Sequence, residues 1–413
     1  MKILYIAYSC SPTYGSEDAI GWNIPFQAAK AGHIVDVITK AEHKEIIESW
    51  IKNSSDNNIP KFHFIEINKF LKKVAHGPLY TLRLFDFSKK AYKIAESLSC
   101  NSKIDIIHQI TPVEFRSIGD YGNIKGIQFI LGPIAGGQKI HKSLSSYSTK
   151  KIQEWIRILM NRAVIQSKTY KKKFEKANVV LFANDETKDF FIKNGYSVKE
   201  SIVIPEIGVI DNLKDKKIYK DFYDNITFLM VGRLITIKGF DIVLDSITNI
   251  KNKNFNIRIC GDGELLEHFK YRIKEEKLGK NVELIGFVDY REMESEYKNA
   301  DVLIMPSLRE ATGTVLVEAM THGIPVITFN QFGAKKIVSN KCGYILNLNN
   351  CSQKPYEKIA EAIDYFIENS NQIKIKGKKA QEVIAQFTWE KKFELYSKIY
   401  LLGEDYVQKT TIN

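Results

Sequence analysis

The chain has 413 residues, which exceeds one ordinary domain and suits two of roughly 200 residues each. With 44% hydrophobic residues it can bury two cores, and it has no continuous apolar stretch of the roughly 18 residues that a membrane-spanning helix needs. The net charge of +12 favours acidic partners such as sugar diphosphates, anionic lipid or nucleic acid, but the lysine clusters match no nucleic-acid-binding module.

The cysteines and the N-terminal segment point to a cytoplasmic protein. The first apolar run, ILYIA, is too short for a signal peptide. The five cysteines form no C-x-x-C pair and have no His at metal-ligand spacing. We expect reduced, mostly structural thiols at Cys10, Cys100, Cys260, Cys342 and Cys351.

The chain begins with a short apolar run, MKILYIAYS, followed by the polar loop CSPTYGSED and an apolar segment around Trp22. This order predicts a buried strand, a loop and a helix that Pro25 kinks. Gly15 and Ser16 then lie at the carboxyl edge of a parallel sheet, where α/β proteins bind ligands. A plain connecting turn explains the same residues.

Further strands are predicted at HIVDVITK, KFHFIEI, IDIIHQI and GIQFILGPI, with a helix from Pro78 to about Ser99. His108 lies near the carboxyl end of IDIIHQI, where a lone His is more often structural than functional. Gly136 and Gly137 follow the last of these strands and leave space for a ligand, although a tight turn accounts for them equally well.

Residues 139–176 are strongly basic and have a helical pattern, with Trp155 and aliphatic residues interleaved among Lys and Arg. An amphipathic basic helix of this kind can lie on an anionic membrane surface. A surface helix packed on its own domain is the other interpretation. The strands ANVVLFAN and SIVIPEI follow, and the polar stretch from Asp211 to Asp224 predicts the interdomain connection.

In the second half, the buried run ITFLMVG leads through RLITIKGF into a helix. Arg233 and Lys238 therefore share one strand-to-helix connection at the ligand edge of a second sheet. Two fixed cations there can stabilise the charge on a departing diphosphate, with Arg gripping two oxygens and Lys acting as a point charge. Taken alone, such a basic pair is usually solvated.

The stretch from Leu308 to Ile327 joins a strand, DVLIMPS, to a predicted helix, TVLVEAMTHG. Gly313 precedes the helix, and because it has no side chain a ligand can approach the backbone there. The free N–H groups of the first turn and the helix dipole make a phosphate site, with Glu310 and Glu318 on its flanks. Alternatively, Glu310 caps the helix and Glu318 is solvated.

These motifs resemble those of the retaining glycosyltransferases of family 4. Glu310 and Glu318 stand as E-x7-E directly before AM-x-x-G-x-PVI, and Arg233 and Lys238 stand in VGR-x-x-x-x-KG. GSE-x3-GW at the N-terminus and the stretch GPIAGG at residues 132–137 resemble a subgroup of that family. The family usually has Gly-Phe-Gly after the first Glu, whereas Ala311-Thr312-Gly313 keeps only the second glycine.

The resemblance implies an α/β protein of the GT-B fold, in which two Rossmann-like, doubly wound parallel-sheet domains face a cleft. We place the acceptor-side domain at residues 1–208 and the nucleotide-sugar donor domain at residues 209–388. A C-terminal helix, residues 389–413, is expected to return to the first domain.

The resemblance also implies roles for particular residues. Arg233 and Lys238 would hold the diphosphate, Glu310 would orient the donor sugar, Glu318 would hold the ribose, and His108 would contact the sugar. Further donor-binding positions are Gly15, Ser16, Gly232, Gly261, Gly286, Val288, Ala311, Thr312, Gly313, Thr314 and Val315, with Asp262 and Gly263 in the adjoining turn. Gly136, Gly137 and Trp22 would face the acceptor.

The implied reaction is retaining transfer of a sugar from a donor such as a UDP- or GDP-sugar to a saccharide or lipid-linked saccharide, in cell-surface polysaccharide or glycolipid biosynthesis. No cofactor or metal is expected, and the chain has no D-x-D triplet. Three other interpretations stay open: a GT-B-type nucleotide-sugar epimerase, a non-catalytic nucleotide-sugar-binding protein, and a basic nucleic-acid-binding protein.

Overall fold

The computed structural model describes residues 1–13, 15–75, 77–197, 200–210, 219–220, 223–289, 291–349 and 352–402. Most of the predicted connection 211–224, and Cys351, lie outside the described residues. Contacts divide the chain into two compact units. The first unit comprises Met1–Gln138, Ile152–Gly208 and Trp389–Asn413, and the second comprises Lys139–Lys151 and Val209–Thr388.

The first unit contains a seven-stranded sheet in the order β3-β2-β1-β4-β5-β6-β7, with all neighbours parallel. The strands are β1 (Lys2–Ala7), β2 (Ile34–Lys40), β3 (Lys61–Ile65), β4 (Ile106–Thr111), β5 (Gln128–Ile134), β6 (Val179–Phe182) and β7 (Ser201–Val203). Strands β1, β4, β5 and β6 are buried along nearly their whole length, which fits strands that are covered on both faces. Because the order reverses between β1 and β4, the loops after these strands border the topological switch point.

Large aromatic residues including Phe87, Phe115, Phe129 and Phe191 fill the core around this sheet. The helices that cover the sheet are α1 (Glu17–Lys30), α2 (Lys44–Asn53), α3 (Lys69–Val74), α4 (Thr81–Asn101), α5 (Lys151–Gln166), α6 (Lys168–Phe174), α7 (Asp185–Lys193) and α15 (Trp389–Leu402). Short 3-10 turns occur at Ala41–His43, Gly77–Tyr80 and Tyr121–Asn123.

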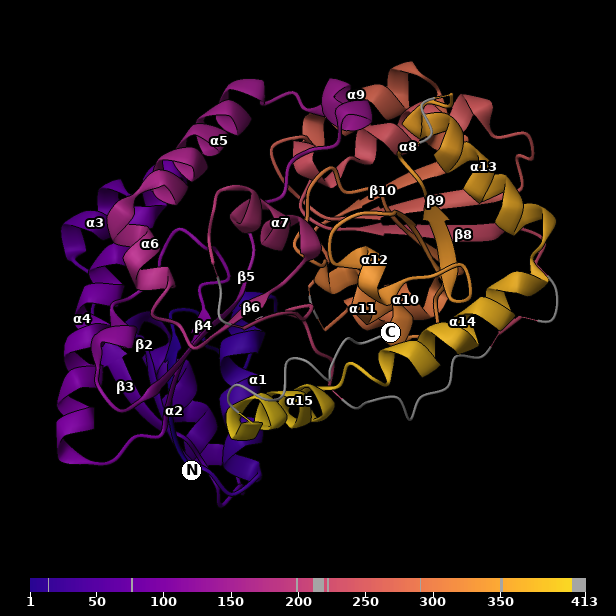
Figure 1. The fold of residues 1–413 in the computed structure, drawn as a ribbon. Coiled ribbons are helices and arrows are strands. Elements are labelled where there is room, and N and C mark those ends of the chain that lie inside the picture. Colours follow the sequence, from indigo (N-terminus) through magenta and orange to yellow (C-terminus); the bar gives the residue numbers. More distant parts are fainter. Residues whose placement is uncertain are drawn as a thin grey trace. The chain divides into compact units, whose positions relative to one another are not determined.

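The last helix, α15, belongs to the first unit and lies beside α1 (Figure 1). Trp389 at its start packs directly on Gly208, where a Cβ atom would lie 2.6 Å from the indole ring. Only a glycine at position 208 permits this contact, so Gly208 allows the start of α15 to pack on the first unit.

The second unit has a six-stranded parallel sheet in the order β10-β9-β8-β11-β12-β13. The strands are β8 (Ile226–Val231), β9 (Phe255–Cys260), β10 (Val282–Gly286), β11 (Val302–Met305), β12 (Val326–Phe329) and β13 (Gly343–Leu346). The order reverses between β8 and β11, so the loops that follow β8 and β11 meet at the switch point where doubly wound sheets bind ligands.

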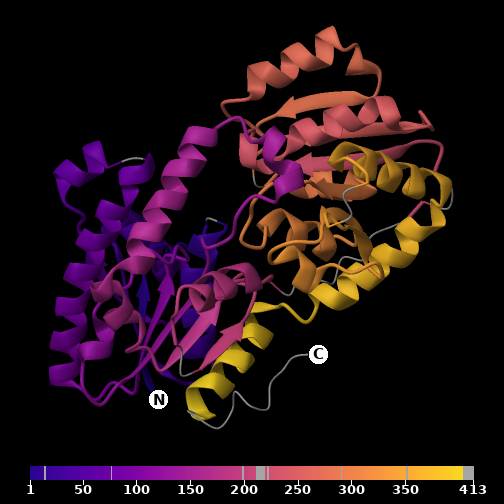
Figure 2. The same ribbon diagram turned by 45° about the horizontal axis from the view of Figure 1, so that its top comes forward.

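Seven helices of the described chain surround the second sheet, and α13 packs against α8 (Figure 2). They are α8 (Phe240–Ser246), α9 (Leu266–Glu275), α10 (Met293–Asn299), α11 (Thr314–Thr321), α12 (Ala334–Ile337), α13 (Pro355–Glu368) and α14 (Asn371–Ile384), with 3-10 turns at Thr236–Lys238, Ile247–Asn249 and Leu278–Lys280. None of the helices in the described part of the chain combines the length and apolarity that crossing a membrane requires.

The prediction that residues 139–176 form one helical stretch is wrong. A 3-10 turn, η4 (Lys142–Tyr147), is followed by an extended connection to α5, and α6 begins after a second break at Ser167. Residues Lys139–Lys151 belong to the second unit, although the predicted first domain included them. The cause is Leu144, which is fully buried in the core of the second unit.

Candidate active site

The turn after β8 carries Lys238 over a glycine. Lys238 ends the 3-10 turn Thr236–Lys238, and a Cβ on Gly232 would lie 3.6 Å from Lys238 Cε. Gly239, which follows, has φ 70°, and a Cβ there would lie 2.2 Å from the Pro306 carbonyl oxygen. Glycine is therefore required at position 239, and it lets the turn after β8 approach the loop after β11.

Lys238 and Glu310 form an ion pair that joins these two loops. The Leu308 amide also donates to the Ile237 carbonyl at 2.8 Å. Both charged side chains are about one-fifth exposed, at 19% for Lys238 and 23% for Glu310. The two residues that the sequence assigned to diphosphate and sugar therefore meet at the switch point of the second sheet.

Arg233 is exposed at the start of the same turn. Within the described part of the chain, no hydrogen bond or ion pair involves its guanidinium. The guanidinium is therefore a bidentate donor that is available to an incoming anion.

Helix α11 begins at the other side of this loop. The N-cap residue of α11 is Gly313, which has φ 101° and no side chain that could bond to the first turn. A Cβ at Gly313 would lie 2.8 Å from Met305 Sδ. The loop is fixed by the Gly333 amide, which donates to the Ala311 carbonyl at 2.8 Å, and Thr312 is fully buried. The helix start thus presents backbone N–H groups suited to an anion, with Thr314 and Val315 half-buried in its first turn.

Glu318 lies one turn into α11 and is not a solvated surface residue. The Tyr297 hydroxyl donates to its carboxylate at 2.6 Å, and burial raises the pKa of Glu318. Tyr297 stacks on His322 with ring centroids 5.0 Å apart, and His322 Nδ1 is 2.9 Å from the Glu318 carbonyl oxygen. Tyr297 was missed from the sequence, because nothing about a Tyr in a charged helix marks it as the partner of a carboxylate 21 residues later.

The turns after β9 and β10 stack on the turn after β8. The Gly232 amide donates to the Cys260 carbonyl at 3.1 Å, and the Gly261 amide donates to the Gly286 carbonyl at 2.7 Å. A Cβ on Gly261 would lie only 1.9 Å from the Gly232 carbonyl oxygen, and one on Gly263 would lie 2.6 Å from that of Leu234. The glycines at 261 and 263 therefore allow close stacking of three turns.

Two other donor-side positions lie at the open end of this stack. Nothing lies within 4 Å of a Cβ placed on Gly286, and Val288 is half-exposed beside Phe287. Asp262 uses its backbone carbonyl to accept from the Leu234 amide at 2.8 Å. The space around Gly286 is therefore open, although its carbonyl already accepts from the Gly261 amide.

His108 does not reach a ligand site, so its predicted contact with the donor sugar is wrong. It is fully buried in the middle of β4. Its Nε2 donates to the Gly132 carbonyl at 2.6 Å, and its Nδ1 lies 2.7 Å from the Tyr400 hydroxyl of α15. Burial lowers the pKa of His108 to about 4, so the ring is neutral and structural.

Trp22 is likewise a core residue, which corrects its predicted place on the acceptor side. It is 6% exposed and packs within 6 Å of Phe26, Trp50 and Phe62 in an aromatic cluster on α1, α2 and β3. Pairs of this kind stabilise a core beyond the area that they bury.

The glycine loop after β5 is packed rather than open. A Cβ on Gly137 would lie 2.9 Å from Phe190 Cβ, so this position has no room for a ligand. The Gly136 carbonyl accepts from Arg157 at 2.9 Å and from Asn161 at 2.8 Å. Both glycines thus serve tight packing under α5 and α7, contrary to the predicted ligand space.

Gly15 and Ser16 lie in the exposed loop after β1, at the switch point of the first sheet. Ser16 has φ 58°, and nothing lies within 4 Å of a Cβ on Gly15. The next residue, Glu17, was missed as a feature of its own. Its carboxylate accepts from the Val113 amide at 3.3 Å, and burial together with Glu114 raises its pKa to about 7.

The described residues contain no group of three or more His, Cys, Asp or Glu side chains that could hold a metal ion. The charged groups of the second unit are instead arranged for an anion: an exposed guanidinium, a Lys on a carboxylate, and a helix start. That is the chemistry of a diphosphate-binding loop set.

Residues 211–383 match the family model described as Glycosyl transferases group 1. The matched region lies within the second unit and contains Arg233, Lys238, Glu310 and Glu318.

Two curated relatives are similar over part of their length. The uncharacterized glycosyltransferase MJ1178 of Methanocaldococcus jannaschii is 31% identical over 192 residues, which are 46% of this chain and 52% of that protein. The capsular polysaccharide biosynthesis glycosyltransferase CapM of Staphylococcus aureus is 26% identical over 214 residues, 49% of this chain and 54% of CapM. The matches therefore span about half the length of these relatives.

The fold is shared with a solved structure over nearly the whole chain. The crystal structure of Anabaena Alr3699/HepE in complex with UDP aligns with a TM-score of 0.64 at 17% identity, covering 97% of this chain and 99% of that chain. The two doubly wound parallel-sheet units are those of the GT-B fold.

Proposed function

We propose that this chain is a retaining glycosyltransferase that moves a sugar from a nucleotide diphosphate donor to a saccharide or lipid-linked saccharide. The observation that carries the proposal is the Lys238–Glu310 ion pair at the switch point of the second sheet, flanked by the exposed Arg233 and the start of α11. CapM, a relative named for capsular polysaccharide biosynthesis, supports a role in building a cell-surface polysaccharide. The UDP in the HepE complex supports a nucleotide donor.

The arrangement suits a front-face displacement that needs no enzymic nucleophile. The acceptor oxygen bonds to the anomeric carbon as the bond from that carbon to the phosphate oxygen breaks, and the acceptor proton passes to the leaving phosphate. Lys238 and Arg233 stabilise the diphosphate charge that builds up, Glu310 orients sugar hydroxyls, and Glu318 holds ribose hydroxyls. Because cations and helix N–H groups supply this stabilisation, we propose a reaction without metal or cofactor.

A panel of UDP-, GDP- and ADP-sugars in a thermal-shift assay tests the donor. One donor is expected to raise the melting temperature, because a ligand that binds only the folded state stabilises it by mass action. Incubation of that donor with saccharide acceptors should then yield a product with the anomeric configuration of the donor. Inversion would reject the retaining mechanism, epimerised donor would indicate an epimerase, and binding without turnover would indicate a sensor.

We also propose that the first unit docks on an anionic membrane surface. Large apolar side chains are exposed on α3, α4 and α5, including Phe70 at 68%, Phe85 at 46%, Ile152 at 75% and Trp155 at 60%. Lysines accompany them in the KFLKKV sequence of α3. Burial of apolar groups together with attraction to lipid charge favours anionic membranes.

Flotation with vesicles tests this docking. Binding to anionic vesicles in preference to neutral ones is expected, and Trp155→Ser with Ile152→Ser should weaken it. Equal recovery with both lipid compositions would reject the membrane surface.

The free thiols of Cys10, Cys100, Cys260 and Cys342 support a cytoplasmic location for the enzyme.

A further inference from the structure

Residues 139–151, here called the strap, belong to the second unit, although the segments on both sides of them belong to the first. Leu144 is fully buried in the second core, and Ile140 and Tyr147 pack against the same core. The strap is therefore built into the second unit. It is not a loop that runs over solvent.

Three polar contacts tie the end of the strap to the neighbourhood of Lys238. Thr149 Oγ1 lies 2.6 Å from Thr236 Oγ1, which is buried in the 3-10 turn that ends at Lys238. The Tyr147 hydroxyl donates to Asp245 in α8 at 2.8 Å. Lys150 forms an ion pair with Glu264.

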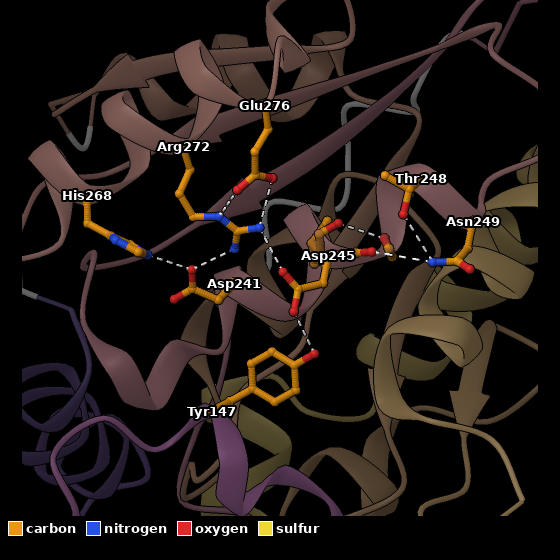
Figure 3. A network of polar contacts seen from close by, with 10 residues as sticks. Tyr147, Asp241, Asp245, Thr248, Asn249, His268, Arg272 and Glu276 are labelled. Carbon is orange, nitrogen blue, oxygen red and sulfur yellow. Dashed lines mark hydrogen bonds and ion pairs between the residues drawn. The ribbon is translucent and has the colours of Figure 1, made fainter.

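The acceptor of Tyr147 is itself rigidly held. Figure 3 shows Asp245 between Tyr147 and Arg272, with Arg272 Nη2 2.7 Å from Asp245 and Nη1 3.0 Å from Asp241. His268 contacts Asp241 at 2.8 Å from the other side. Since α8 starts directly after Gly239, this network fixes the helix that leaves the Lys238 turn.

Glu264 belongs to the same neighbourhood. The Leu265 amide donates to the Leu234 carbonyl at 3.0 Å, so the segment that pairs with Lys150 is bonded to the turn after β8. The three strap contacts thus reach the Lys238 turn itself, the helix after it, and the segment stacked on it.

The residue before the strap is anchored in the first unit. The Gln138 side chain accepts from the Gly136 amide at 2.8 Å and from the Thr187 hydroxyl at 3.1 Å, and its carbonyl accepts from Arg157 at 3.0 Å. A short run of chain therefore connects a fixed point of the first unit to the proposed diphosphate-binding turn of the second.

We propose that the strap positions Lys238, and that Thr149 and Tyr147 are positioning residues for the transfer reaction. This inference rests on the proposed function. The strap holds Thr236 and α8 on the two sides of Lys238, so that the ammonium reaches the leaving diphosphate in a fixed geometry. Without the strap contacts, the Lys238 ammonium is still present but no longer held in this geometry.

Turnover of Thr149→Val and Tyr147→Phe tests this role. The matched controls are Thr248→Val and Tyr344→Phe, whose hydroxyls make exposed contacts with Asn249 and Glu361. Each strap variant should lower kcat by about 3- to 10-fold with KM for the donor nearly unchanged, because a neutral hydrogen bond is lost and the contact of Lys238 acts in the transition state. Thr149→Ser, which keeps the hydroxyl, should restore kcat.

Hydrogen exchange provides a readout that does not depend on activity. In the Thr149→Val/Tyr147→Phe double variant, amides of residues 232–239 should exchange faster than in the control double variant, while β8 and β11 stay protected. Strap variants that match the controls in both kcat and exchange would overturn the inference even if the wild type is fully active. A wild type without turnover would instead reject the proposed function, and the exchange result alone would then decide the role of the strap.

Discussion

The Lys238 ammonium is bonded to the Glu310 carboxylate, although 72 positions separate the two residues in the sequence. Under the proposed function, the Glu310 carboxylate holds the Lys238 ammonium before the donor binds, and the diphosphate then takes the place of the carboxylate. Because both side chains remain partly exposed, an anionic ligand can reach the cation without unfolding either loop.

Replacement of Lys238 by Ala should separate catalysis from folding. We expect turnover to fall roughly 100- to 1000-fold, since one preorganised charge at a developing anion is lost, while the melting temperature changes little. Steady-state transfer kinetics and thermal unfolding measure the two effects. Lys270→Ala, which removes an exposed partner of Glu267, is the control. Near-normal transfer by Lys238→Ala would show that this cation does not act on the leaving group.

Glu310→Gln should impair the sugar and spare the nucleotide. Hydrogen bonds to a charged acceptor contribute about 1.5 to 3 kcal/mol, so we expect transfer to fall roughly 10- to 100-fold. Calorimetric titration with the bare nucleoside diphosphate should give a dissociation constant close to that of the wild type. A parallel loss of nucleotide binding would mean that Glu310 only supports the loop.

Tyr297→Phe should weaken recognition of the ribose. The variant removes the hydroxyl that donates to Glu318 at 2.6 Å and leaves a half-buried carboxylate without this partner. We expect affinity for the ribonucleoside diphosphate to fall about 2- to 12-fold, with a smaller change for the deoxyribose analogue. Tyr271→Phe, at a site that is 64% exposed, serves as the control. Identical losses for both nucleotides would place Tyr297 outside ribose recognition.

His108 should make the folded state sensitive to acid. Its pKa is lowered by burial to about 4, whereas in an unfolded chain it is about 6.5. As pH falls from 6.5 toward 4, the unfolded state binds a proton that the folded state refuses, so this contribution to the free energy of unfolding is fully present above pH 6.5 and is lost below it. The span is on the order of 3 kcal/mol.

Denaturant unfolding of the wild type and His108→Gln at several pH values between 4 and 7.5 measures this dependence. The difference in unfolding free energy between the two proteins should shrink as pH falls. If the variant does not fold, NMR titration of the wild-type ring decides instead: a His108 ring that protonates near pH 6.5 in the folded protein would contradict the prediction.

The strands and the site of the second unit were largely predictable from sequence. Parallel strands buried on both faces appear as continuous apolar runs, and the residues that follow them collect at one sheet edge, which is why Lys238 and Glu310 could be assigned to one place. The glycines at 232, 261 and 313 could be placed there for the same reason. Their close packing partners could not, since these come from other turns.

The errors have a common physical cause. In a strand such as β4, where every residue is buried, the alternation that would tell which face His108 occupies is absent. Trp22 lies in a segment that follows a ligand-edge loop, yet its ring points into an aromatic cluster that only the tertiary fold brings together. The basic pattern of residues 139–176 likewise gave no sign that Leu144 is buried in the core of the second unit.

The strap and α15 together make the chain pass between the two units four times, after Gln138, Lys151, Gly208 and Thr388. Neither unit is therefore a contiguous stretch of the gene. A chimaera with a single junction near residue 208 would graft a foreign donor half onto a strap shaped for the native one and would deprive His108 of Tyr400. Under the proposed function, exchange of donor specificity by recombination needs residues 139–151 to travel with the second unit, although the family match at 211–383 does not include them.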